Sequence, residues 1–346
     1  MTITNELFDT RTLLGVMEAQ APINNYWLDL CFPNQVNFTT EEIEFEKLTR
    51  YRVLAPLVIP TAQGRPSYKK ASRVTRLRPA YVKPKDTVNE SEVIARQPGS
   101  LLGAPPSKQQ SFDARVADIL NEQNKAIQRR WEWMASEAIQ DGAVTLVDNE
   151  YPEVTVDFGR NNNHTVTLTG GDLWDSGTGD IIGDINEWRF MMRQAKFGGP
   201  ATRMTVGTDA WAAMSQDPAV MELMDITVRG TQVNLNRGTQ QGEVVEFMGS
   251  FDNTLDVYLY RDYYEDNDGN TTDFMSPKDI VLTGPNIMGY RCFGAILDKR
   301  SQFNALPIFP KMWDENDPPV TFLMSQSAPL MVPVNPDNTL RATVVS

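Results

Sequence analysis

The stretch SFDARVADILNEQNKAIQRRWEWMASEAIQD, residues 111–141, carries the clearest helical pattern in the chain. Its apolar residues recur at three- and four-residue steps, which places them along one stripe of an α-helix. They are Phe112, Val116, Ile119, Leu120, Ile127, Trp131, Met134, Ala138 and Ile139. Ser111 is the expected N-cap, Gly142 the expected stop, and charged residues such as Glu132 are expected on the opposite face. Such a helix spans about 45 Å and is either the spine of an elongated subunit or an ordinary core helix.

Upstream of this helix, between Lys47 and Arg96, an otherwise acidic chain turns basic. The segment holds 12 Lys or Arg against 3 Asp or Glu, whereas the whole chain has a net charge of −13. Glycines and prolines interrupt its short β-type runs, and the alternating residues 41–46 (EEIEFE) lead into it as a strand. The segment therefore predicts a two-stranded basic arm. A cationic arm on an anionic body allows copies of the chain to bind head to tail.

Two short apolar patches precede the arm, at residues 13–17 and 26–32. Neither patch is long enough to form a domain. Exposed Trp27 and Phe32 would favour aggregation, so they are expected to pack on the body of the same chain or on a neighbour.

Downstream of the helix, the pattern predicts a mixed α+β region. Strands of a β-meander are expected at 143–147, 154–158 and 165–169, further strands at 204–207, 244–247 and 255–260, and helices at 180–196 and 208–224. Asp268 and Gly269 form a hairpin turn. A Pro-rich stretch begins at Ser301 and ends in a strand near residues 342–345.

No catalytic or ligand-binding motif emerges from the sequence. The single histidine, His164, is expected in a surface turn, and the glycines between Gly177 and Gly183 indicate a loop before a helix. The segment around Asp266 fails as a calcium loop because Met275 stands where the twelfth position requires Glu. Carboxylate pairs are inevitable in so acidic a chain and are no evidence of acid–base catalysis. We therefore expect no enzyme activity, no cofactor and no metal.

Composition limits the surroundings and partners of the chain. No run of 18 or more apolar residues occurs and the first residues lack a signal-peptide pattern, so we expect cytosol-like surroundings and no membrane partner. Cys31 and Cys292 match no metal or redox spacing and are expected to be buried free thiols. The net negative charge argues against wholesale nucleic-acid binding.

Three local motifs occur along the chain in this order: Phe38-Thr-Thr-Glu41, Tyr81-Val-Lys-Pro-Lys85 and Gln326-Ser-Ala-Pro-Leu-Met331. Together they resemble the phage capsid protein E family, the lambda-type major capsid proteins of tailed phages, and the region from about 172 to 261 departs more. The resemblance implies an α+β, Hong Kong 97-like fold. Its expected parts are an N-terminal arm (1–46), an E-loop (47–98), a P-domain with the spine helix (99–175), an A-domain (176–300) and a C-terminal return to the P/A-domain sheet (301–346).

The resemblance also implies a function, in which pentamers and hexamers of the chain form the icosahedral head shell around double-stranded DNA. The implied partners are the chain itself, a separate scaffold protein, a decoration protein, a portal protein and packaged DNA held without sequence specificity. Assembly in the host cytoplasm and residence in the virion follow. A covalent crosslink through Lys69 or Lys70 is not expected, because no buried acid marks it.

Subunit contacts are expected mainly along the basic arm. The predicted interface residues are Arg65, Lys69, Lys70, Arg73, Arg76, Arg78, Tyr81, Lys83, Lys85, Trp27 and Phe32. Each exposed ion pair contributes about 0 to 1 kcal/mol, so the set matters more than any member. Two alternatives stay open: a tail-tube-like particle component, and a carbohydrate-acting enzyme or binding module suggested only by carboxylates and seven Trp.

Overall fold

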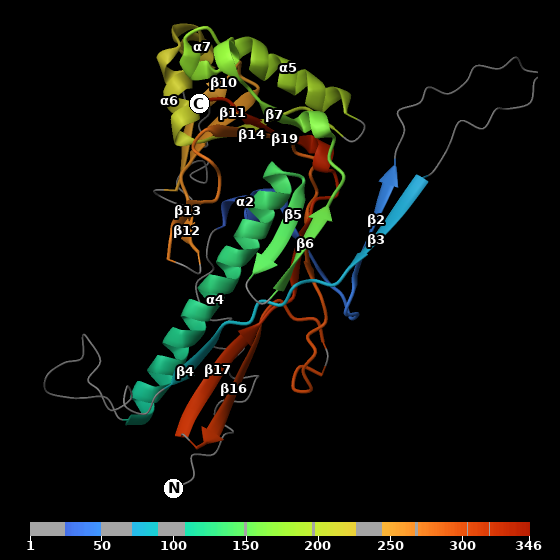
Figure 1. Cartoon of the computed structure of the whole chain (residues 1–346), viewed down its shortest axis with the longest axis vertical. Helices are drawn as coiled ribbons and strands as arrows, with labels where there is room; N and C mark the ends of the chain where they lie inside the picture. Colours follow the sequence, from blue (N-terminus) through green and yellow to red (C-terminus); the bar gives the residue numbers. More distant parts are fainter. Residues whose placement is uncertain are drawn as a thin grey trace, which may run out of the picture.

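The computed structural model describes residues 25–49, 71–88, 108–148, 151–195, 198–225, 244–266, 269–302, 304–317 and 319–346. Helix α4 (Lys108–Gln140) runs along the length of the molecule, and a sheet covered by helices lies at one end (Figure 1). The subunit is elongated, and α4 is its spine.

The predicted apolar stripe of α4 is confirmed, since Val116, Leu120, Ile127 and Ile139 are among its buried residues. Two predictions about this helix are wrong. Ser111 lies inside the first turns instead of capping them, because the helix begins three residues earlier. Glu132 is buried instead of facing solvent. After the helix, Gly142 adopts φ +67°, the left-handed conformation of a typical helix stop.

The sheet at the end of the molecule has seven strands and mixed directions. Its order is β7 (Thr165–Thr167), β19 (Thr339–Thr343), β14 (Asp279–Thr283), β8 (Arg203–Val206), β11 (Leu255–Tyr260), β10 (Val245–Phe251) and β9 (Met224–Asp225). Helices α5 (Ile181–Gln194), α6 (Thr208–Gln216) and α7 (Pro218–Leu223) pack around it (Figure 1). Met204, Leu282 and Leu340 are buried in the core that the sheet and helices share.

A single helix at 208–224 was expected, and the structure has two. Asp217 leaves the helical conformation, and its side chain accepts a hydrogen bond from the backbone N–H of Ala219. Pro218 then opens α7, because proline fits the first position of a helix but not its interior.

The predicted meander after α4 is only partly correct. Strands β5 (Ala143–Asp148) and β6 (Tyr151–Asp157) form an antiparallel hairpin beside α4. The third expected strand, β7, instead pairs in parallel with β19, with Thr165 opposite Arg341. Alternation predicts which residues share a face of a strand, but not its partner.

A second sheet packs on the first half of α4. It consists of β16 (Phe309–Asn316), β17 (Pro319–Gln326) and β4 (Lys85–Val88). Leu120 and Leu323 meet in its apolar core. The Gln123 side-chain amide donates to Asp86 Oδ2 at 2.8 Å and to the Leu323 carbonyl at 3.0 Å, which fixes the sheet on the helix.

The largest core joins α4 to the N-terminal part of the described chain. Helix α2 (Tyr26–Cys31) contacts α4, and strands β1 (Asn34–Asn37), β15 (Tyr290–Phe293) and β18 (Pro329–Val332) form a three-stranded sheet next to it. Cys31 and Cys292 are both buried and free, as predicted. This core therefore connects segments from the N-terminal and C-terminal parts of the described chain to the spine.

Two hairpins complete the described structure. Strands β2 (Ile43–Thr49) and β3 (Ala71–Leu77) pair antiparallel and project from the body (Figure 1). Strands β12 (Tyr263–Glu265) and β13 (Thr271–Asp273) confirm the hairpin predicted at Gly269. Among the helices of the described segments, none is long and apolar enough to cross a membrane.

Candidate interaction surfaces

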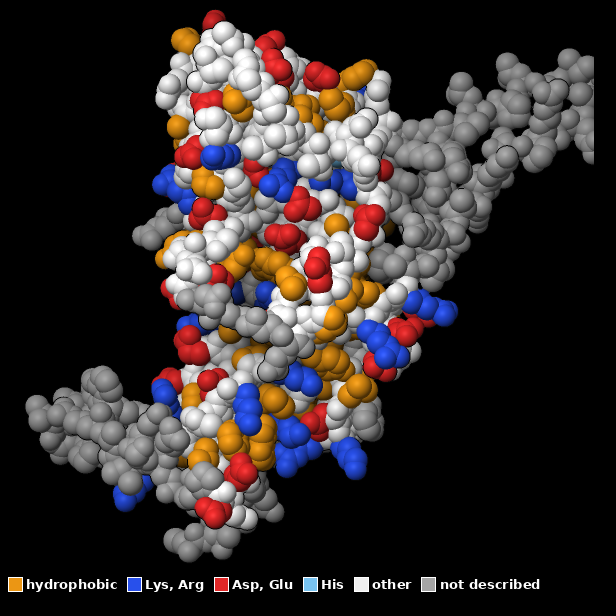
Figure 2. Space-filling view, in the orientation of Figure 1, with side chains coloured by type: hydrophobic (Ala, Val, Ile, Leu, Met, Phe, Trp, Pro, Cys, Tyr) orange, Lys and Arg blue, Asp and Glu red, His pale blue; other side chains and the backbone are white. Residues whose placement is uncertain are grey.

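The root of the projecting hairpin carries paired charges. Arg76 lies opposite Glu44 in the β2–β3 ladder, and Arg76 Nε is 2.8 Å from Glu44 Oε1. Arg78 lies 3.7 Å from Glu41 Oε1 and 3.5 Å from Glu42 Oε1. Basic and acidic side chains accordingly intermingle at this root (Figure 2). Their high exposure leaves them accessible to a neighbour, with part of the positive charge compensated within the hairpin.

Three further predicted interface residues lie where the arm joins the body. Tyr81 donates a hydrogen bond from its hydroxyl to the Ala295 carbonyl at 2.8 Å. The Lys83 ammonium lies 4.6 Å from the Tyr81 ring centre, and the Lys85 ammonium lies 3.8 Å from that of Phe322. These contacts anchor the base of the arm on its own body, while Lys83 and Lys85 remain exposed.

Four further predicted interface residues belong to the basic arm. Arg65, Lys69 and Lys70 lie outside the described residues. Arg73 belongs to β3, where its backbone is opposite Lys47.

The prediction that Trp27 and Phe32 are interface residues is wrong. Both have 0% of their surface exposed, and both belong to the core built on α4. A side chain without exposed surface cannot meet a neighbour while the chain keeps this fold. The sequence predicts that this apolar patch packs either on the body of the same chain or on a neighbour. In the structure it packs on the body of the same chain.

Glu132 fixes α2 on the spine helix. Its two carboxylate oxygens accept hydrogen bonds from the backbone N–H groups of Trp27 at 2.7 Å and Leu28 at 3.0 Å. Burial raises the pKa of Glu132 to about 8, and the nearby carboxylates of Asp262 and Asp29 act in the same direction. The two N–H donors oppose this shift, because they favour the charged form.

Sequence reasoning missed Glu132, although a signal for it exists. Polar residues recur along α4 at four-residue steps beside the apolar stripe: Asn124, Gln128, Glu132, Ser136 and Gln140. Four-residue steps place side chains on one face of a helix. Within this second stripe, Ser136 and Gln140 both donate to the Phe274 carbonyl, at 2.8 and 2.7 Å.

Two arginines tie the end of α4 to the seven-stranded sheet. Arg160 is buried and donates to the Ile139 carbonyl at 2.9 Å and to Thr165 Oγ1 at 2.7 Å. Arg341 on β19 pairs with Asp279 at 2.8 Å and with Asp141. Burial lowers the pKa of Arg160 to about 10, which leaves it charged at neutral pH. Positive charge at a helix C-terminus is favourable.

The prediction that His164 lies in a surface turn is half wrong. It ends a 3-10 turn (Asn162–His164) as expected, but its ring is buried, with Nδ1 2.9 Å from the Thr339 carbonyl. Burial lowers its pKa and favours the neutral ring. The histidine is therefore a packing residue at the junction of β7 and β19.

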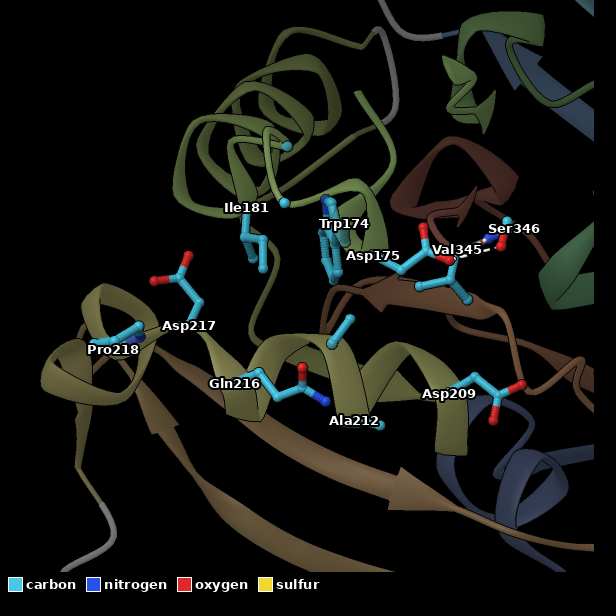
Figure 3. Close-up of a pocket in the computed structure, with 13 residues that line it drawn as sticks. Trp174, Asp175, Ile181, Asp209, Ala212, Gln216, Asp217, Pro218, Val345 and Ser346 are labelled. Atoms are coloured by element: carbon cyan, nitrogen blue, oxygen red, sulfur yellow. Dashed lines mark hydrogen bonds between the residues drawn. The ribbon is translucent and has the colours of Figure 1, made fainter. Parts of the chain in front are cut away.

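A surface cavity of about 660 Å³ opens between α6, α7 and the segment Trp174–Ser176 (Figure 3). Three carboxylates border it, and two already hold local structure. Asp175 accepts hydrogen bonds from the Ser346 backbone N–H and hydroxyl (Figure 3). Asp217 caps α7 by accepting from the Ala219 N–H. The pKa of Asp175 is lowered by its bonds from Ser346. No group of His, Cys, Asp and Glu side chains that could hold a metal ion occurs within the described residues.

Comparison with known proteins gives a consistent result over the whole chain. A family model described as phage major capsid protein E matches residues 9–344. The major capsid protein of Enterobacteria phage P21 is 30% identical over 342 residues, covering 96% of this chain and 97% of that protein. The major capsid protein of Escherichia phage lambda is 27% identical over the same length and coverage.

Solved structures agree on the fold. The crystal structure of a protein assigned as a prophage capsid protein of Escherichia coli CFT073 has a TM-score of 0.76. It is 23% identical and covers 98% of this chain, with 99% of its own chain covered. The likeness in sequence and in fold therefore extends over nearly the full length.

Proposed function

This chain belongs to the phage major capsid protein E family, and from that premise we propose that its copies assemble as pentamers and hexamers into an icosahedral shell. It is a major capsid protein of a tailed phage, with a Hong Kong 97-like fold. The family match over residues 9–344 is the observation that carries the proposal. It favours a head shell over a tail tube or a carbohydrate-acting enzyme.

The structure supports different roles in the shell for the body built on α4 and for the projecting β2–β3 hairpin. Helix α4 and the sheets packed on it share apolar cores, and the β2–β3 hairpin projects from this body (Figure 1). A projecting arm can lie on a neighbour only if its base is fixed, and Tyr81 supplies such an anchor through the Ala295 carbonyl. We therefore assign residues 47–98 to the E-loop, residues 99–175 to the P-domain and residues 176–300 to the A-domain.

The basic arm supplies the directional part of the contact. Four basic residues of the arm would face the acidic surface of a neighbouring copy: Arg65, Lys69, Lys70 and Arg73. Attraction between opposite charges would then fix how the two copies are oriented. Arg76 and Arg78 would contribute less, because each is already paired with glutamates of its own hairpin. The contact should weaken with added salt, because exposed ion pairs are screened.

Further partners follow from this role. A scaffold protein, a decoration protein and a portal protein would complete the particle, and DNA would fill it without sequence-specific contact. Assembly would occur in the host cytoplasm and the product would be part of the virion. The proposed role is structural, and the family match supports it.

Negative-stain electron microscopy of the expressed chain, alone and with the neighbouring genes, tests the proposal. Closed shells are expected. Tubes would favour the tail-tube alternative, and discrete small oligomers would overturn the shell proposal.

A charge variant tests the arm. The triple substitution R65S/K69S/K70S should prevent shells from closing, whereas R65K/K69R/K70R keeps the charge and should allow closure. Equal assembly of both variants would contradict the electrostatic role of the arm.

A further inference from the structure

Three exposed apolar residues lie at or just beyond one end of the β15–β18 ladder. Met288, Tyr290 and Val334 expose 59%, 36% and 42% of their surface; we call them the Met288 patch. In the ladder, Tyr290 is opposite Val332. Beyond the ladder, the Asn335 N–H donates to the Ile287 carbonyl at 3.2 Å. Met288 directly follows Ile287, and Val334 directly precedes Asn335, so this hydrogen bond holds the two residues near each other, just beyond the end of the ladder.

The backbone at Met288 is held in an unfavourable conformation. Its φ is +49°, a left-handed value that bulky residues rarely adopt. The next residue, Gly289, donates to the Cys31 carbonyl at 2.9 Å, and a Cβ there would meet that oxygen at 2.4 Å. The end of α2 thus pins the turn that carries Met288. Strain of this kind persists where the surroundings enforce it, and it gathers at functional positions.

The patch lies in a part of the chain without charge. Residues 280–290 and 318–336 contain no Asp, Glu, Lys or Arg, although 22% of the chain is charged. The charged residues that follow these two stretches in sequence already have partners: Arg291 pairs with Asp29 at 2.8 Å, and buried Asp337 accepts from the Asn161 N–H at 2.8 Å. Asn335, next to Val334 in sequence, is neutral, and its Nδ2 donates to the Asn286 carbonyl at 2.6 Å.

Exposed apolar residues in stretches without charge indicate which partner contacts the Met288 patch. Two copies of a chain with net charge −13 repel each other over most of their surface. Electrostatic repulsion between copies is weakest where the surface carries no charge. Apolar side chains also lose their hydrating water at little cost, so an apolar patch favours contact between copies. A strongly basic partner would instead bind the acidic surfaces of the chain. We propose that the Met288 patch is a contact between neighbouring copies of this chain in the shell.

This inference rests on the self-assembly proposed above, and it adds an apolar contact separate from the basic arm. Met288→Asn tests it, because Asn tolerates the left-handed conformation and lacks the apolar group. The thermal midpoint of the unassembled full-length chain should be unchanged or higher. The protein concentration needed for shell formation should rise about tenfold, as the loss of one buried apolar side chain from a contact predicts. Met288→Leu keeps the apolar group and should assemble at the wild-type concentration.

A direct readout complements the variants. Mild peroxide should oxidise Met288 in the unassembled chain but spare it in purified shells, as mass spectrometry of the peptide would show. Buried Met204 is the internal reference and should stay unoxidised in both samples.

Three outcomes would contradict the proposed contact at the Met288 patch. Met288 could be oxidised equally in shells and in the unassembled chain, or Met288→Asn could assemble at the wild-type concentration. A lowered thermal midpoint of Met288→Asn would instead show that Met288 stabilises the fold of the single chain. Protection that requires another phage protein would assign the patch to that protein instead. An absence of closed particles from the wild-type chain would overturn the shell proposal itself, and is distinguishable from these results.

Discussion

Glu132 is a carboxylate whose surroundings differ sharply from water. Only 2% of its surface is exposed, and its pKa is raised by burial to about 8 from an ordinary 4.5. The folded chain therefore holds this proton between about pH 4.5 and 8, whereas the unfolded chain does not. Its contribution to stability is fully present below pH 4.5 and is lost as the pH rises through 8.

The substitution Glu132→Gln removes this titration and keeps the shape of the side chain. Each unit of pKa difference corresponds to about 1.4 kcal/mol. Between pH 5 and 8 the thermal midpoint of the wild-type chain should therefore fall by several degrees more than that of Glu132→Gln. Other titrating groups are common to both proteins and cancel in the comparison. Parallel pH profiles would show that Glu132 is already ionised across this range.

Single residues also show where sequence reasoning reaches its limit. Trp27 and His164 were identified as notable from their type, but their surroundings depend on segments far away in the sequence. Trp27 is buried against α4, over 100 positions later, where Glu132 binds its N–H. His164 is covered by contacts with Thr339. Local patterns carry no information on such partners.

At the scale of elements, the junction between α4 and β5 depends on Gly142. Its φ of +67° disfavours any side chain, and an added Cβ would lie 2.6 Å from Arg160 Cβ. Gly142→Ala should therefore combine backbone strain with displacement of the buried arginine that binds the helix end. We expect a loss of about 2 to 4 kcal/mol in the free energy of unfolding, measured by denaturant titration of the unassembled chain.

Gly177 offers a matched control for this substitution. It has a similar φ of +77°, but nothing lies within 4 Å of the position of an added Cβ. Gly177→Ala should cost only the backbone term, about 1 kcal/mol. Equal losses for both variants would mean that contact with Arg160 contributes nothing at the junction.

Periodic elements were predictable and their pairing was not. The stripe of α4 and the hairpin β12–β13 follow from local spacing and turn residues, and both are present. The parallel pairing of β7 with β19 joins residues 176 positions apart, such as Thr165 and Arg341, and no local pattern specifies it. The same holds for the interaction surfaces. The basic arm is visible in composition, whereas the Met288 patch exists only because two distant strands pair.

At the scale of the whole molecule, one apolar core connects α2, α4 and the β1–β15–β18 sheet. Both cysteines lie in that core, Cys31 on α2 and Cys292 on β15. Burial raises the pKa of Cys292 to about 12 and also raises that of Cys31. The thiolate is the reactive form, so at pH 8 such a pKa lowers the reactive fraction about a thousandfold relative to a free thiol.

Thiol labelling of the unassembled chain therefore reports whether this core opens as one unit. If it does, Cys31 and Cys292 should both resist iodoacetamide in native buffer and become reactive at the same denaturant concentration. The variants C31S and C292S each leave one thiol and allow the two sites to be followed separately. Reaction of Cys31 at a lower denaturant concentration than Cys292 would show that α2 detaches first. In that case the turn at Gly289, which the Cys31 carbonyl holds, would also be released before the rest of the core.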